Sequence, residues 1–96
     1  MANKNKQTRG HIFISGRVQG VAFRYYSQKT AQKLGVTGWT RNCMNGKVEI
    51  MVEGEKENVI QFIDWCHVGP WSAIVENVDI IWENYRGEFV SFNIRG

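Results

Sequence analysis

The sequence contains few of the residues that define several protein classes. Its 96 residues include two cysteines and one proline, which excludes a disulfide-rich scaffold and a proline-rich disordered chain. No apolar run approaches the roughly 18 residues that a membrane-spanning helix needs. Cys43 and Cys66 lack CxxC or Cys/His metal-ligand spacing, and whether they form a disulfide stays open. The composition predicts one soluble domain.

Acidic residues are absent from the first half of the chain. Residues 1–47 contain nine Lys and Arg and no Asp or Glu, whereas residues 48–96 contain three basic and nine acidic residues. The net charge of +3 therefore divides into +9 and −6. Such an asymmetry indicates that one part of the molecule contacts an anion, without identifying it.

The N-terminal segment is basic but has no apolar stretch of a signal peptide behind it. We predict a flexible basic tail of unknown purpose over residues 1–9 and a single domain over residues 10–96. A cytoplasmic location follows by default.

Hydrophobic periodicity divides the domain into strands and helices. Alternating apolar residues predict strands over 11–15 and 47–53, and a further strand that carries Trp39 is expected over 36–42. Asn45-Gly46 predicts a hairpin turn between the strands over 36–42 and 47–53. Helical spacing predicts a helix from Phe23 to the stop at Gly35, and a second over 59–66 that ends before Gly69-Pro70. Further strands are expected around 78–82 and 90–94.

This order, βαββαβ plus a short C-terminal strand, predicts an α+β fold of the ferredoxin-like split βαβ type. We expect an antiparallel sheet with both helices on one face. The first and second strands then run parallel on either side of the third. The loop over 16–24 and the neighbourhood of Asn42 should therefore face each other at one edge, about 10 Å apart.

The segment Gly16-Arg17-Val18-Gln19-Gly20-Val21-Ala22-Phe23-Arg24 joins a strand to a helix and contains no acid. Glycines allow a loop to turn its N–H groups inward, and a helix N-terminus adds further free N–H groups, so this segment suits a phosphate-sized anion. Arg24 opposes the helix dipole unless an anion lies between them. The simpler alternatives are a plain glycine turn with a solvated Arg24, and an Asn42 that only caps the end of its strand.

These residues resemble the acylphosphatase family. Gly16 to Arg24 is similar to the family's GxVQGVxFR loop, and Gly38-Trp39-Thr40-Arg41-Asn42 with Gly46-Lys47-Val48-Glu49 is similar to its GWxRNxxDGxVE segment. Leu34-Gly35, Trp65 and Gly69-Pro70 also match, so the resemblance runs from about residue 11 to residue 94. Thr40 and Asn45 depart from the usual Val and Asp. Because Asn-Gly makes the same kind of turn, neither change affects the expected site.

The resemblance implies hydrolysis of the carboxyl-phosphate bond of acyl phosphates, giving a carboxylate and inorganic phosphate. It implies that Arg24 and the backbone amides of five loop residues bind the phosphoryl group: Val18, Gln19, Gly20, Val21 and Ala22. Asn42 would position the attacking water. No metal or cofactor is implied, and the partners are the small acyl phosphate and inorganic phosphate.

Two other functions compete with this interpretation. An RRM-type nucleic-acid-binding module shares the layout, but its third strand needs exposed aromatic rings, and Val48 to Glu53 offers two carboxylates instead. The other alternative is a phosphate-binding domain without turnover. His11 and His67 have no catalytic or metal spacing, and Cys43 should point away from Asn42 because adjacent strand residues face opposite sides. We expect a monomer that binds neither nucleic acid nor membrane.

Overall fold

Seven elements follow one another in the order β-α-β-β-α-β-β. The structure, a computed structural model, describes residues 6–96. Its elements are β1 (Gln7–Arg17), α1 (Phe23–Leu34), β2 (Thr37–Asn42), β3 (Val48–Glu55), α2 (Lys56–Val68), β4 (Ile74–Glu83) and β5 (Phe92–Ile94). The predicted order of helices and strands is therefore confirmed.

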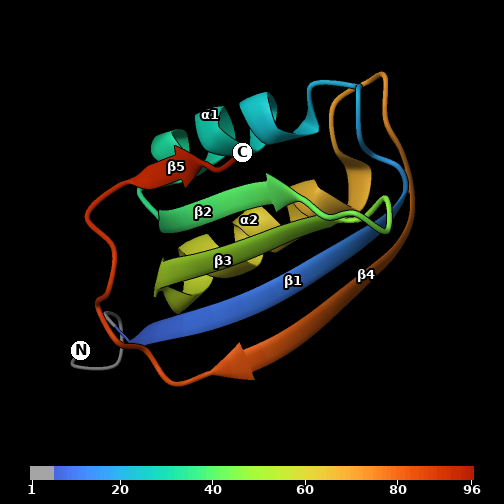
Figure 1. Cartoon of the computed structure of the whole chain (residues 1–96). Helices are drawn as coiled ribbons and strands as arrows, with labels where there is room; N and C mark the ends of the chain where they lie inside the picture. The colour runs from blue at the N-terminus through green and yellow to red at the C-terminus, as the bar shows by residue number, and fades with distance from the viewer. Residues whose placement is uncertain (1–5) are drawn as a thin grey trace.

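The strands form a single sheet in the order β4-β1-β3-β2-β5, with both helices behind it in the view of Figure 1. β1 and β2 each pair antiparallel with β3, so they run parallel to one another as predicted. β5 pairs parallel with β2. The α+β class is thus confirmed, but the sheet is mixed rather than purely antiparallel, because the C-terminal strand returns beside β2.

The core lies between the sheet and the two helices. Every second residue of the central strands faces it: Ile12 and Ile14 of β1, and Val48, Ile50 and Val52 of β3, all fully buried. They pack in one cluster with apolar residues of both helices and of β5. The alternation predicted for β3 is therefore confirmed on its helix-covered face.

A β-bulge interrupts the register of β1 with β4 just before the segment that leads to α1. The β1–β4 register shifts between Ser15 and Gly16. Gly16 has a φ of 121°, and a Cβ there would lie 2.2 Å from the carbonyl oxygen of Ile74. Only glycine fits this close approach, so Gly16 allows the register to shift one residue before β1 ends at Arg17.

The predicted tail over residues 1–9 is wrong for its last three residues. Gln7, Thr8 and Arg9 belong to β1 and pair with residues of β3. Arg9 is 5% exposed and bonds carboxylates of both β3 and β4. These ion-pair partners are distant in sequence, so the local polarity of the segment did not reveal them. Residues 1–5 lie outside the described part of the chain.

Candidate active site

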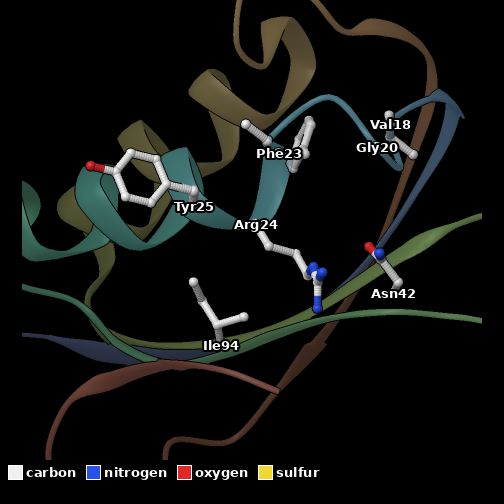
Figure 2. Close-up of a pocket in the computed structure, with 8 residues that line it drawn as sticks. Val18, Gly20, Phe23, Arg24, Tyr25, Asn42 and Ile94 are labelled. Carbon is white, nitrogen blue, oxygen red and sulfur yellow. The ribbon is translucent and has the colours of Figure 1, made fainter. Parts of the chain in front are cut away.

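The connection between β1 and α1 forms one wall of a cavity at the edge of the sheet where β2 ends. The cavity has a volume of about 200 Å³. It is lined by Val18, Gly20, Ala22, Phe23, Arg24, Tyr25, Asn42 and Ile94 (Figure 2). The structure therefore brings the 18–22 loop and Asn42 together, as the strand order predicted.

Two residues of the 18–22 loop adopt the left-handed conformation. Gly20 has a φ of 74° and Ala22 a φ of 63°, and for alanine this conformation costs about 1 kcal/mol. Ala22 is also the N-cap of α1, and no side chain caps the helix there. The first turn contains no acidic residue. The positive end of α1, with N–H groups that lack a capping acceptor, therefore borders the cavity.

Arg24 extends from the first turn of α1 toward the strand that carries Asn42, as Figure 2 shows. Its Nη1 donates a hydrogen bond to the backbone carbonyl of Arg95 at 3.0 Å. The Arg95 amide in turn donates to the Thr40 carbonyl at 2.8 Å. The residue after β5 thus links Arg24 to β2. Since a carbonyl uses one of the five guanidinium N–H groups, the others are free to bind an anion.

Asn42, the last residue of β2, lies across the cavity from the 18–22 loop. Its amide oxygen Oδ1 is buried and has no hydrogen-bond partner. A buried acceptor left unpaired costs about 1–3 kcal/mol. An unsatisfied buried polar atom calls for an explanation, so Asn42 is a candidate site residue.

Gln19 and Val21 are predicted site residues whose positions do not line the cavity. The Gln19 amide donates to the carbonyls of Cys43 at 2.7 Å and Lys47 at 2.9 Å. Ser72 Oγ donates to the carbonyl of Val21 at 3.0 Å. The 18–22 loop is therefore held from one side by the β2–β3 hairpin and from the other by the segment that follows α2.

Three residues that line the cavity were not predicted as site residues: Phe23, Tyr25 and Ile94. Phe23 is 1% exposed and belongs to the core, whereas Tyr25 and Ile94 are 49% and 40% exposed. The only sequence feature that could have indicated one of these residues is the position of Tyr25 directly after Arg24. Ile94 arrives through the parallel pairing of β5 with β2, which local periodicity does not specify.

No carboxylate lines the cavity. Cys43, directly after β2, and Glu49 of β3 turn to the opposite side of the sheet. There Glu49 accepts hydrogen bonds from Arg41 Nε at 2.6 Å and from the Cys43 thiol at 3.7 Å. Burial and the neighbouring Glu49 raise the pKa of the Cys43 thiol, so it stays protonated. Both Cys43 and Cys66 are free, and burial also raises the pKa of Cys66.

Residues 6–96 contain neither a cluster of metal ligands nor a membrane-spanning helix. No group of three or more His, Cys, Asp or Glu side chains lies close enough together to hold a metal ion. Across the same residues, no helix is long and apolar enough to cross a membrane.

This cavity is a candidate anion-binding site on a ferredoxin-like sandwich, because the uncapped start of α1, Arg24 and the unpaired Asn42 oxygen meet there without a carboxylate in the lining. The acylphosphatase family model matches residues 10–94, and the chain belongs to this family. An acylphosphatase of Roseiflexus sp. is 49% identical over 90% of this chain and 92% of its own.

Solved structures agree with this assignment. The acylphosphatase of Coxiella burnetii superimposes with a TM-score of 0.89 at 36% identity, over 96% of this chain and 95% of its own. That of Bacillus subtilis gives a TM-score of 0.89 at 30% identity, over 93% and 99%. The expected class of enzyme, a hydrolase of acyl phosphates, is thereby confirmed.

Proposed function

We propose that the 18–22 loop and Arg24 bind the phosphoryl group of an acyl phosphate and that Asn42 positions the water that attacks it. The proposal rests chiefly on one observation, the buried Asn42 oxygen without a partner in a cavity that also holds Arg24. Its expected products are a carboxylate and inorganic phosphate.

Phosphate binding follows from the charges around the cavity. The loop backbone turns through left-handed conformations at Gly20 and Ala22, and such turns direct successive N–H groups to one side. The amides of residues 18–22 and the uncapped start of α1 then surround three phosphoryl oxygens. The planar guanidinium of Arg24 can bind two of these oxygens at once, a geometry that a lysine ammonium does not reproduce.

Water positioning is the role that satisfies Asn42. An acceptor oxygen that lacks a donor takes a hydrogen bond from water, and this bond fixes where the lone pairs of the water point. A phosphoryl transition state carries spread negative charge, so catalysis consists mainly of positioning and prearranged positive potential. The neutral amide orients the water without adding negative charge near the substrate.

The reaction balances without a basic side chain. The water oxygen forms a bond to phosphorus while the bond between phosphorus and the carboxyl oxygen breaks, and the carboxylate leaves with the electron pair. We assign the proton of the attacking water to a phosphate oxygen of the substrate itself. A carboxylate is a good leaving group, so an acid that donates a proton to it is not required.

A hydrolysis assay tests the proposal. Purified protein should release inorganic phosphate from acetyl phosphate and leave a simple phosphate monoester intact. Activity should persist in EDTA, because we assign no step to a metal. Restoration of a chelated, inactive enzyme by added metal would contradict this mechanism. Phosphate binding without turnover would favour the non-catalytic alternative.

The remaining expectations stay predictions. A cytoplasmic location, a monomeric state and the absence of nucleic-acid binding rest on the sequence. Against an RRM-like function, Glu49 and Glu53 alternate with the core residues of β3 and therefore lie on its helix-free face, where such a module needs aromatic rings.

A further inference from the structure

A second hollow lies on the other side of the 18–22 loop. Its volume is about 700 Å³, against about 200 Å³ for the cavity that holds Arg24 and Asn42. Two residues, Gly20 and Ala22, line both spaces. The hollow opens between the loop and the connection from α2 to β4, two segments that lie side by side in Figure 1 and are joined by the Ser72–Val21 hydrogen bond.

Exposed apolar side chains converge on this hollow. Trp71 is 95% exposed, Ile74 57% and Tyr26 45%, and all three line it. Single exposed apolar residues are ordinary on a protein surface, but a group around one depression marks a binding site. Among residues 6–96, Arg17 is the one charged residue in the lining, which contains no carboxylate from this part of the chain.

The residues that separate the cavity from the hollow, Gly20 and Ala22, have the smallest side chains. Gly20 has no side chain and Ala22 only a methyl group, and a Cβ placed on Gly20 would meet nothing within 4 Å. In an acyl phosphate, a single oxygen joins the phosphorus to the acyl carbon. A phosphate bound over the loop amides therefore places its acyl group beside the cavity wall, where the hollow begins.

We propose that this hollow is the acyl subsite and that it favours substrates with a flat apolar acyl group. The inference rests on the proposed function, because it places the phosphate in the smaller cavity. Trp71, Tyr26 and Ile74 supply apolar surface for an aromatic or branched acyl chain. Because the lining has no carboxylate, it does not repel the carboxylate that forms when the bond to phosphorus breaks.

The test compares benzoyl phosphate with acetyl phosphate on the parent and on Trp71→Ala. Because Trp71 is almost fully exposed, its removal should leave the fold intact. We expect KM for benzoyl phosphate to rise about tenfold, the effect of one lost aromatic contact, while KM for acetyl phosphate stays unchanged. Trp71→Phe, which keeps a ring, should retain most of the preference. Val90→Ala, at a residue 98% exposed outside both spaces, is the matched control.

Three results would overturn the inference. Equal changes for both substrates would show that Trp71 acts on the loop and not on the acyl group. No change for either would show that the hollow is unused. A loss of preference in Tyr25→Ala with none in Trp71→Ala would place the acyl group at the opposite rim, beside Ile94. A parent that hydrolyses neither substrate would instead overturn the proposed function, and the subsite with it.

Discussion

Arg9 and Arg24 both belong to the acid-free half of the chain, yet the fold treats them in opposite ways. Arg9 is 5% exposed and forms ion pairs with Glu53 at 3.1 Å, Glu83 at 2.9 Å and Glu88 at 2.7 Å. Arg24 donates to a single neutral carbonyl and has no carboxylate in its cavity. One cation is neutralised by the protein, and the other has no carboxylate partner among the residues that line its cavity.

The surroundings of the two arginines extend this difference. Glu53 is fully buried and also accepts hydrogen bonds from the amides of Arg86 and Glu88, which fastens the segment after β4 to β3. Near Arg24, the helix is uncapped and the Asn42 oxygen is unpaired. Buried polar groups are paired around Arg9 and left unpaired near Arg24, which is why the second place is the candidate site.

The largest effect should come from Glu53→Gln. This change leaves the buried Arg9 without its fully buried partner, and breaking a buried pair costs about 3–5 kcal/mol of stability. We expect the lower end, because Glu83 and Glu88 still contact Arg9. Urea unfolding measures the loss, and activity per folded molecule should not change.

The control for this change is Glu88→Gln. The Glu88 side chain is 50% exposed, and an exposed ion pair contributes at most about 1 kcal/mol. Equal destabilisation by the two variants would show that the cluster is a surface network without a buried centre.

Arg24→Lys should have the next largest effect, on rate instead of stability. Loss of the planar guanidinium should lower kcat/KM roughly 150-fold. This corresponds to about 3 kcal/mol of transition-state stabilisation, as for other prearranged donors. The free energy of unfolding should stay within about 0.5 kcal/mol of the parent, as for most surface substitutions, because Arg24 is half-buried and lysine keeps its charge. Arg41→Lys, on the opposite face of the sheet, is the matched control. If Arg24→Lys hydrolyses the substrate at the parent rate, catalysis does not need the planar guanidinium.

Asn42→Ala should lower kcat by roughly 100-fold, or about 2.7 kcal/mol, because the water loses its acceptor. Inorganic phosphate should bind as in the parent, since the loop and Arg24 remain. Stability should hold or rise slightly because an unpaired buried oxygen disappears. Calorimetric phosphate binding and steady-state kinetics separate these effects, with Asn93→Ala as the control. Weaker phosphate binding with unchanged kcat would assign Asn42 to the anion site instead.

The sequence predicts the site better than it predicts the charged cluster, for a physical reason. The 18–22 loop and Asn42 lie at the ends of strands whose arrangement follows from the βαββαβ order of the elements, so the topology brings them together. Arg9, Glu53, Glu83 and Glu88 meet only through the registers of three strands and the course of the segment after β4. No local pattern specifies those registers, so Arg9 was predicted to lie in a tail.

Residues of the C-terminal strand escaped prediction for a related reason. Three apolar residues at alternate positions predict a strand over 90–94, but they do not indicate which strand of the sheet it pairs with. In the structure only Phe92–Ile94 is a strand, and Val90 is 98% exposed. The parallel pairing with β2 places Ile94 in the cavity and the Arg95 carbonyl against Arg24. Both contacts exist because β5 pairs with β2 and not with β4 at the other edge of the sheet.

The smallest effect concerns Glu49, which is 7% exposed. Burial raises its pKa, but hydrogen bonds from His11 and Arg41 outweigh burial, and the pKa lies below the usual value. A carboxyl with a lowered pKa in the folded state stabilises the fold fully above its unfolded pKa, about 4.3, and loses this contribution as the pH falls through the folded value. Glu49→Gln should therefore lower Tm by a few degrees at pH 6, and the difference from the parent should shrink toward pH 3. Glu53, whose pKa is also lowered, titrates in both proteins, so the comparison isolates Glu49. A difference in Tm that stays constant over this range would assign the effect of the substitution to packing.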